Sequence, residues 1–335
     1  MRDYIIRRLL LLAPIMIGVS LLTFSLFKLI PADAVILRCG FGCTPEVVED
    51  LREQLGLNRP AYPVTFDGSP PFVNLHGDSQ YGSWLWNIVA HQDLGRSLTE
   101  GNLEVFSELK HRLPITVELM ILTIIFALVL GILPGILSAI RPNTPSDWIS
   151  RMLSVLWLSV PDFYLGILII TFGSIWVGWT PPQFGEGYVP IYEDPWKNLQ
   201  EFIFPAFVLS VGTAAVIMRL TRSAMLEVLR NDYIRTAWSK GLRERTVVWR
   251  HSLKNALIPV VTLVGVQIGA LIGGAVIIEQ LFNLNGIGKY TIEAIIRRDV
   301  FVVQSLTLVF ALVYVISNLF VDIAYAWLDP RIHYT

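Results

Sequence analysis

The stretch from Arg219 to Pro259 reads RLTRSAMLEVLRNDYIRTAWSKGLRERTVVWRHSLKNALIP and lies between two long apolar segments. It contains nine lysines and arginines against three acids. The basic residues are Arg219, Arg222, Arg230, Arg235, Lys240, Arg243, Arg245, Arg250 and Lys254. A loop with this density of positive charge between two candidate membrane spans resists translocation. We therefore expect it to lie on the cytoplasmic side, and its simplest role is to hold the topology.

A short helix is predicted near the middle of this loop. Asn231 or Asp232 can serve as its N-cap, and Gly241 can end it in a left-handed conformation. The helix would have about nine residues and a length of about 14 Å. Three residues at intervals of four fall on one face of it: Leu229, Tyr233 and Ala237. Because so short a helix is not stable alone in water, we expect it to dock on another surface.

The composition indicates a membrane protein. Of 335 residues, 53% are hydrophobic and 16% are charged, and the mean hydropathy is +0.56. A soluble domain of this length carries a larger share of charged residues. The formal net charge is −1, so no overall attraction to nucleic acid or to an anionic surface is expected. The chain is predicted to be an all-α, polytopic integral membrane protein.

Six apolar segments are long enough to cross a bilayer as helices. They cover approximately residues 9–30, 116–140, 149–177, 202–218, 259–278 and 302–327. The first could also be a signal peptide, because Ala32-Asp33-Ala34 resembles a cleavage site. Its apolar run of about 22 residues is longer than a signal core of roughly 7–15, so we interpret it as an uncleaved span. With the basic loops inside, six spans place both termini in the cytoplasm.

The one long polar segment, residues 36–112, contains more acids than bases and is expected outside. Helices are predicted in it from Thr44 to Gly56, over residues 81–90 and over residues 105–113. Two shorter external segments are expected at residues 178–200 and 279–303. The predicted parts are 1–35 with the first span, 36–113 as an external helical subdomain, and 114–335 as the transmembrane core with the basic loop at 219–258.

The two cysteines, Cys39 and Cys43, are separated by three residues in a glycine-rich turn. Metal binding needs more ligands than one pair offers, and no histidine lies close in sequence. If this segment is outside, a small disulfide is favoured over free thiols, because oxidising compartments preserve such bonds. No metal site is predicted.

The sequence gives little support to an enzyme. It has no Walker A pattern, so ATP phosphates cannot be held in that way, and Gly286-Ile287-Gly288-Lys289 lacks the required spacing. Neither HExxH nor GxSxG occurs, and the five histidines show no paired ligand spacing. We predict no catalytic residues in this chain.

The basic loop also carries a family pattern. Residues 235–241, Arg-Thr-Ala-Trp-Ser-Lys-Gly, resemble the EAA loop of ABC importer permeases, in which Glu-Ala-Ala is followed by three residues and Gly. Residues 256–259, Ala-Leu-Ile-Pro, stand where the motif's closing Ile-x-Leu-Pro belongs. Arg235 and Thr236 depart from Glu and Ala, and the gap from Gly241 to Pro259 is longer than in sugar permeases. Both departures resemble the dipeptide and oligopeptide branch.

Further segments are similar to the same branch. They are the run from Thr44 to Pro60, Asp93-Leu94-Gly95-Arg96-Ser97-Leu98, Phe282 to Lys289, Arg298-Asp299 with Val303-Gln304, and Asp329-Pro330-Arg331. The part from roughly residue 61 to residue 80 has no clear match in this branch and looks like an insertion. The resemblance otherwise covers nearly the whole chain.

The chain is thus identified as a member of the peptide/nickel family of ABC importer permeases, which implies the type I permease fold with six spans. The resemblance implies a homologous second permease subunit, two ATP-binding-cassette ATPase subunits and a periplasmic or lipid-anchored substrate-binding protein, assembled in a bacterial or archaeal cytoplasmic membrane. ATP and Mg would be bound by the ATPases, so no cofactor is expected in this chain. Di- or oligopeptides are the expected cargo; nickel chelates, glutathione and haem are carried by near relatives.

By the same resemblance, the predicted short helix enters a cleft of an ATPase and couples its motion to the spans. The residues expected to do this are Asp232, Tyr233, Arg235, Thr236, Ala237, Lys240, Gly241 and Pro259. Gly241 is expected both to end the helix and to serve this coupling.

A translocation pathway is suggested by Ser159, Pro161 and Asp162 in the third span. By the rise per residue, Asp162 lies roughly mid-membrane, where a carboxylate is costly and indicates a cavity or a pathway. The alternative is a carboxylate that is hydrogen-bonded to a neighbouring helix, beside backbone opened by the proline.

Two other classes of function would leave different marks on the sequence. An ion-coupled secondary transporter predicts inverted repeats and several ionisable residues at mid-span; we find no repeat and essentially one such residue. An intramembrane hydrolase predicts paired catalytic groups within the spans, and none is visible.

Overall fold

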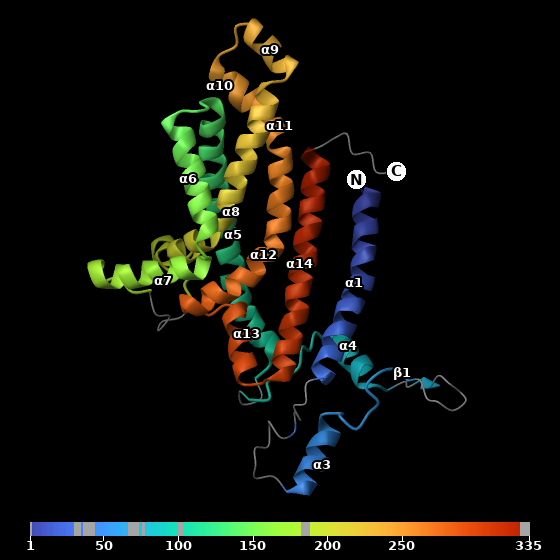
Figure 1. Cartoon of the computed structure of the whole chain (residues 1–335). Helices are drawn as coiled ribbons and strands as arrows, with labels where there is room; N and C mark the ends of the chain where they lie inside the picture. Colours follow the sequence, from blue (N-terminus) through green and yellow to red (C-terminus); the bar gives the residue numbers. More distant parts are fainter. Residues whose placement is uncertain are drawn as a thin grey trace. The chain divides into compact units, whose positions relative to one another are not determined.

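The computed structural model describes residues 2–29, 35, 44–65, 74–75, 78–99, 103–181 and 188–328. This part of the chain is helical almost throughout (Figure 1). The predicted helical class is therefore confirmed, with the addition of one short antiparallel pair of strands. The strands β1 (Val64–Thr65) and β2 (Asn74–Leu75) pair Val64 with Leu75. They lie in the segment that was predicted to be an insertion.

Within the described ranges, five helices are long and apolar enough to cross a membrane, and a sixth span results if one bent pair of helices is counted as one. The five are α1 (Arg2–Leu29), α5 (Val105–Ile140), α8 (Pro195–Leu229), α12 (Ile258–Leu281) and α14 (Val300–Leu328). The bent pair is α6 (Pro145–Ser159) with α7 (Asp162–Phe172), which continues into the π-helical turn Gly173–Val177.

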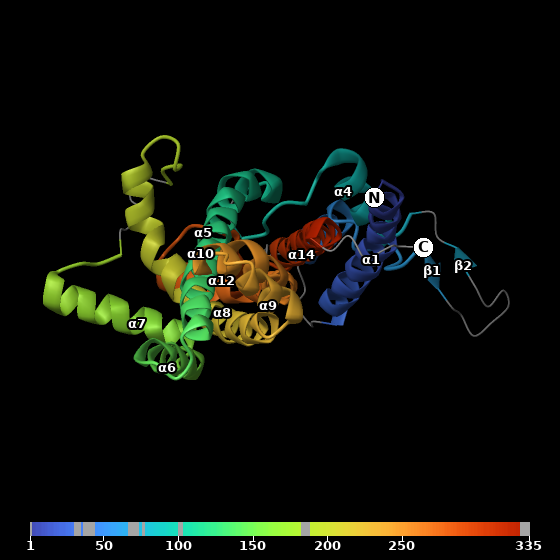
Figure 2. The same ribbon diagram turned by 90° about the horizontal axis from the view of Figure 1, so that it is seen from above.

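The third predicted span is therefore two helices, with an angle of 97° at the break (Figures 1 and 2). Pro161 has no backbone N–H and disfavours helical torsions in the residue before it. Val160 accordingly has φ −102° and ψ 120°, which is extended backbone. The depth predicted for Asp162 assumed one continuous helix, and this assumption is wrong because Asp162 is the first residue of α7.

Other predicted helices are present with shifted ends or are joined to a neighbour. The helix at residues 44–56 is α3 (Pro45–Gln54), and the one at 81–90 is α4 (Gln80–His91). The helix expected at 105–113 is continuous with the second span in the 36-residue α5. Pro114 lies inside it, and because proline has no backbone N–H, one helical hydrogen bond is missing there. Cys39, Cys43 and the 329–331 motif lie outside the described residues.

The contacts within the chain divide it into two compact units. One comprises residues 1–6, 114–289 and 314–335, and the other comprises residues 7–113 and 290–313. Both units contain segments that are far apart in sequence, so each is held together by contacts between distant segments.

In the first unit, α8 is the central helix and contacts α6, α7 and α12. Seventeen of its 35 residues are buried, whereas the other candidate spans present more side chains to their surroundings. Gly131 and Gly135 let α5 approach α8 closely, because a Cβ on either glycine would come within 2.9 Å of a carbonyl oxygen of α8. Small residues at such crossings are typical of helices packed in lipid, where close contact replaces the hydrophobic driving force.

At 35 residues, α8 is about 50 Å long, which exceeds the roughly 30 Å hydrocarbon core. Its last turns therefore extend beyond the bilayer core. This is why the loop from Arg219 begins as helix rather than as an irregular linker.

In the second unit, α1 packs against α4. The Oγ of Ser20 and the Oη of Tyr81 are 2.9 Å apart, and the ring of Phe24 lies edge-on to Tyr81 with 5.5 Å between centroids. The chain before α4 is also tied to α1, because the Oη of Tyr62 donates to the Oγ of Ser25 at 2.9 Å. Helix α4 and the chain just before it are thus packed on the first span.

The α5–α8 crossing gives a first prediction. Gly131→Ala should lower the free energy of unfolding by about 1–3 kcal/mol, because the new methyl group would lie 2.6 Å from the Cγ2 of Ile217. The melting temperature of the purified protein in detergent measures this. Gly273→Ala in α12 is the matched control: nothing lies within 4 Å of its Cβ, so the protein should melt at the same temperature or higher. Equal effects of the two substitutions would contradict the close packing.

Candidate functional site

The basic loop folds as a helical hairpin that extends beyond α8 and α12 (Figure 1). Helix α9 (Asp232–Ser239) begins after Asn231, which occupies the N-cap position but makes no side-chain capping bond. Gly241 has φ +71°, so the predicted left-handed helix end is confirmed. A residue with a Cβ is strained in this conformation, and the glycine therefore fixes where the chain turns.

The inner face of α9 differs from the predicted one. Ile234 is fully buried and Ala237 is 7% exposed, and they pack against the buried Val247 of the returning chain. Tyr233 was placed on this face but is 43% exposed. The prediction extended the i, i+4 spacing from Leu229 across the turn at residues 230–231, and that turn changes the helix direction. The spacing of three from Ile234 to Ala237 is the one that faces the core.

The outer face of α9 is exposed and mostly polar, and its aromatic residues Tyr233 and Trp238 are 43% and 45% exposed. The other exposed residues are Asp232, Arg235, Thr236 and Ser239 in the helix and Lys240 at its C-cap. Two hydroxyls are satisfied within the helix, since the Oγ1 of Thr236 donates to the carbonyl of Asp232 and the Oγ of Ser239 to that of Arg235. The pair Arg235–Asp232 has 3.4 Å between charged atoms and is exposed, so it contributes little to stability. This face is available to a partner.

The returning chain anchors the hairpin. It comprises α10 (Glu244–Thr246), the π-helical segment Val247–Ser252 and α11 (Leu253–Ala256). Val248 and Ala256 lie in one apolar cluster with Ile136 and Ala139 of α5 and Met225 of α8. The hairpin is therefore continuous with the packed helices rather than hung on a flexible linker.

Polar contacts complete this anchoring. The Nδ2 of Asn255 donates to the Oη of Tyr233 at 2.8 Å, which joins the returning chain to α9. Pro259 occupies the first turn of α12, where a missing N–H costs no helical hydrogen bond. The predicted coupling residues thus lie in one hairpin, with Ala237 inside it and the others at its surface or its base.

A buried ion pair lies among the helices that carry the hairpin. The Nε of Arg222 in α8 donates to the Oδ1 of Asp147 in α6 at 2.8 Å, and its Nη2 donates to the Oδ2 at 3.2 Å. Asp147 is fully buried and also accepts a hydrogen bond from Ser138 of α5 and one from the backbone N–H of Asn143. This cluster, Ser138–Asp147–Arg222, joins three helices.

Sequence reasoning missed this cluster and counted Arg222 among the loop charges. The two charged residues belong to different spans, 75 positions apart, and no local spacing relates them. The available signals were Arg222, three residues after the loop begins at Arg219, and Asp147, just before the predicted third span at residue 149.

The predicted pathway residues lie at the break between α6 and α7. Ser159 donates its hydroxyl to the carbonyl of Val155 at 2.8 Å, and Pro161 occupies the N-cap position of α7. The Oδ1 of Asp162 lies 3.4 Å from where a Cβ of Gly212 in α8 would be. Among the described residues, no donor is hydrogen-bonded to the Asp162 carboxylate. The alternative of a carboxylate bonded to a neighbouring helix therefore has no support there.

Two motifs identified in the sequence have structural partners that were not foreseen. Glu279, fully buried at the end of α12, accepts from the Oγ1 of Thr116 at 2.6 Å and from the backbone N–H of Lys289 at 3.0 Å. Gly286 and Gly288 cannot bear a side chain, because a Cβ on either would come within 2.6 Å of Glu279 or of Val276. The Gly-x-Gly segment thus wraps a buried carboxylate.

A similar arrangement exists in the other unit. The Oδ2 of Asp299 accepts hydrogen bonds from the Oγ of Ser97 at 2.6 Å, from the N–H of Leu98 at 2.8 Å and from Thr99. The Oγ of Ser305 donates to the carbonyl of Leu94 at 2.6 Å. The segments 93–98 and 298–304, which were noted separately in the sequence, therefore bind each other.

Tyr188, just before α8, is bound to a carboxylate of α5. Its hydroxyl donates to the Oε2 of Glu118. Burial and the nearby carboxylate raise the pKa of the Tyr188 phenol, so the hydroxyl keeps its proton and remains a donor. The segment before α8 is thereby attached to α5.

Comparison with known proteins places the chain in a family. Residues 127–334 match the model described as binding-protein-dependent transport system inner membrane component, and residues 1–120 match the model of its N-terminal part. The chain belongs to this family and is the membrane component of such a transport system. The alternatives of a secondary transporter and of a hydrolase gain no support.

Full-length relatives agree with this assignment. A putative peptide transport system permease protein of Brucella suis biovar 1 is 39% identical over 334 residues, with all of both chains covered. The dipeptide transport system permease protein DppB of Alkalihalophilus pseudofirmus is 39% identical over 352 residues, again with full coverage. The glutathione transport system permease protein GsiC of Escherichia coli O6:H1 is 35% identical over 334 residues, with full coverage.

The fold agrees with that of a solved transporter. The inward-facing MetNI methionine ABC transporter superposes with a TM-score of 0.54 at 18% identity, covering 67% of this chain and 97% of that chain. The predicted ABC importer permease fold is confirmed.

The buried ion pair gives a second prediction. Arg222→Gln removes the two charge-assisted hydrogen bonds to the buried Asp147 carboxylate and leaves Arg151, whose Nη2 lies 3.4 Å from the Oδ2, as its only cation among the described residues; this should cost about 1.5–3 kcal/mol and reduce the yield of folded protein. The double variant Arg222→Met with Asp147→Leu should recover most of the loss, because it buries no charge. Melting temperatures of the three proteins in detergent decide this. A double variant as unstable as the single one would show that the pair is not the source of the effect.

Proposed function

We propose that this chain forms part of the passage for di- or oligopeptides through a bacterial or archaeal cytoplasmic membrane, driven by ATP that other subunits bind and hydrolyse. The relatives named for peptide and dipeptide transport, which match over their whole length, support the cargo class. ATP and Mg are assigned to the partner subunits.

The observation that carries the mechanism is the geometry of α9. It is an eight-residue helix whose inner residues Ile234 and Ala237 are buried and whose outer residues are free. We assign the outer face to a cleft of an ATP-binding-cassette ATPase. Since the hairpin packs on α5 and α8, a displacement of α9 by the ATPase would be passed to these helices.

The remaining partners follow from the same assembly. A homologous second permease would line the other half of the passage, a second ATPase would serve it, and a periplasmic or lipid-anchored substrate-binding protein would deliver the cargo. Both termini would be cytoplasmic. The external residues 44–112 and 282–299 are our candidates for contact with the binding protein.

Asp162 is assigned to the passage. It sits at the 97° break, and its carboxylate lies close to α8, where the Oδ1 would be 3.4 Å from a Cβ on Gly212. A carboxylate without a hydrogen-bond donor in the described structure can attract the ammonium group of a peptide.

The coupling assignment predicts a selective loss. Arg235→Glu combined with Trp238→Ala alters only exposed side chains of α9, so the chain should fold with an unchanged melting temperature. The complex, purified through this chain and reconstituted in liposomes, should lose at least about 90% of ATP-driven peptide uptake, since exposed aromatic and arginine side chains dominate protein contacts.

A matched control is Glu193→Arg combined with Tyr192→Ala, which reverses one exposed charge and truncates one exposed aromatic side chain on the external segment 178–200, outside the residues assigned to any partner. It should leave uptake unchanged. Uptake by the α9 variant that equals that of the control would refute the coupling role. Uptake by this chain alone, without ATPases or ATP, would refute the proposed importer altogether.

The pathway assignment predicts a change in cargo preference. Asp162→Asn should reduce uptake of peptides with a free amino terminus by about tenfold, and uptake of N-acetylated peptides much less, because one attraction to an ammonium group is removed. Competition between the two peptides in proteoliposomes measures this. An unchanged ratio with normal uptake would remove Asp162 from the passage.

A further inference from the structure

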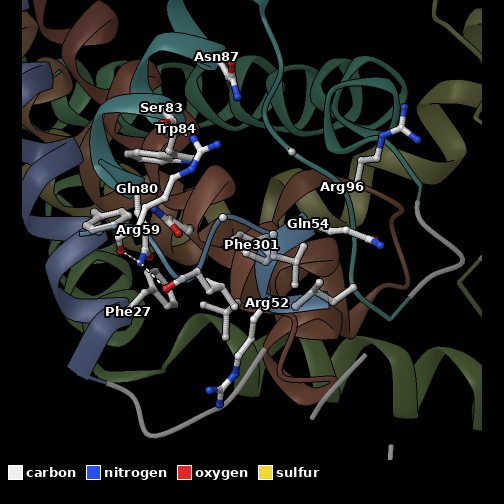
Figure 3. A pocket seen from close by; sticks show the side chains of 18 of the residues that line it. Phe27, Arg52, Gln54, Arg59, Gln80, Ser83, Trp84, Asn87, Arg96 and Phe301 are labelled. Atoms are coloured by element: carbon white, nitrogen blue, oxygen red, sulfur yellow. Dashed lines mark hydrogen bonds between the residues drawn. The ribbon is translucent and has the colours of Figure 1, made fainter. Parts of the chain in front are cut away.

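A pocket of about 740 Å³ lies within the unit formed by residues 7–113 and 290–313. Its walls come from the end of α1, the turn after α3, the first half of α4 and the beginning of α14 (Figure 3). A volume of this size is typical of sites for small molecules. None of its lining residues belongs to the hairpin or to the break at Asp162, and the proposed function does not use it.

The pocket combines aromatic walls with a cationic rim. Phe24, Phe27, Trp84 and Phe301 supply the rings, and Figure 3 labels the last three among the lining side chains. Lys28, Arg52, Arg59 and Arg96 line it, against the acids Glu53 and Asp93. The charge balance therefore favours an anion that carries an apolar part.

Two of the cations are held in exposed and exchangeable ion pairs, whereas Lys28 donates a hydrogen bond to the Oε1 of Gln80. Arg59 pairs with Asp78 at 2.7 Å and Arg96 with Glu104 at 2.8 Å, and all four side chains are about half exposed or more. Exposed pairs of this kind are weak, so a ligand anion can compete for the guanidinium groups.

Gln304 of α14 gives a separate indication of a ligand. It lines the pocket, is only 5% exposed, and its Nε2 has no hydrogen-bond partner. Leaving such a donor unsatisfied is costly. An oxygen acceptor in the pocket would remove this cost, and a phosphate supplies several.

The position of the pocket indicates the source of the anion. Lys28 is in the last turn of α1, at the end of a candidate span. Nearby α4 exposes Trp86 (65%) and Val89 (71%) one turn apart. A helix that presents tryptophan and valine beside the end of a span is suited to the interface between lipid and water. The pocket then lies at the level of lipid headgroups.

We propose that this pocket binds one anionic phospholipid. Its phosphate would lie among Lys28, Arg59 and Gln304, and its glycerol and upper acyl chains would lie along Phe24 and Trp84. Bound in this way, the lipid would join α1, α4 and α14 of this unit.

The test measures lipid retained by the delipidated full-length chain in its complex. Phosphatidylglycerol and phosphatidylcholine with identical acyl chains are supplied together in detergent, and the bound lipid is counted by native mass spectrometry. We expect about tenfold more phosphatidylglycerol than phosphatidylcholine. Lys28→Gln with Arg59→Gln should abolish this preference, whereas Lys110→Gln with Arg141→Gln, which removes two exposed charges elsewhere, should preserve it.

A second variant separates binding from folding. Gln304→Met removes the unsatisfied donor and keeps the volume, so the lipid-free protein should melt at the same temperature or higher, while phosphatidylglycerol retention falls about tenfold. Equal retention of the two lipids by the native chain, or full retention by the variants, overturns the proposal. So does displacement of phosphatidylglycerol by millimolar dipeptide or by inorganic phosphate alone, which would identify a site for a soluble anion.

Discussion

The contact between Asp147 and Arg222 constrains the part of the molecule that carries the hairpin. A fully buried carboxylate is stable only with its cation and hydrogen-bond donors in place, because desolvation of an unpaired charge costs several kcal/mol. Ser138 and the N–H of Asn143 complete the set, so α5, α6 and α8 meet at one polar point in an otherwise apolar environment. Moving one of these helices alone would break the cluster. A displacement that starts at α9 is therefore expected to move the three helices together, and the 97° break after α6 is the nearest place where the chain can change direction.

The same principle explains two other motifs. Glu279 and Asp299 are buried carboxylates whose acceptors are filled by hydroxyls and backbone N–H groups from residues far away in sequence. Backbone donors impose no residue type but require close approach, which is why Gly286 lies against Glu279. Each carboxylate thus fixes a loop onto a helix, and family resemblance in these segments reflects folding rather than contact with cargo.

Sequence reasoning predicted what depends on local pattern. Long apolar runs gave the spans, and the basic loop gave α9 with its glycine end, because length, charge and left-handed turns are properties of neighbouring residues. It failed where geometry depends on distant residues. Pro161 signalled a disturbance but not its 97° angle, which is set by packing on α8. The buried face of α9 was misassigned at Tyr233 because the turn before the helix resets the periodicity. The partners of Asp147 and Asp299 lie 75 and 202 positions away, so no local spacing relates them.

The hairpin also explains how this loop departs from the EAA pattern. Ala237 and Gly241 match the pattern, and both are constrained by the fold: Ala237 is 7% exposed against Val247, and Gly241 has φ +71°. Arg235 and Thr236 replace Glu and Ala, and both are exposed on the outer face. The fold therefore requires a small residue at position 237 and a glycine at position 241. It does not restrict the residue type at positions 235 and 236. On the proposed function, these two positions are the ones that meet the ATPase, so their change alters recognition of the partner while the helix and its anchoring stay the same.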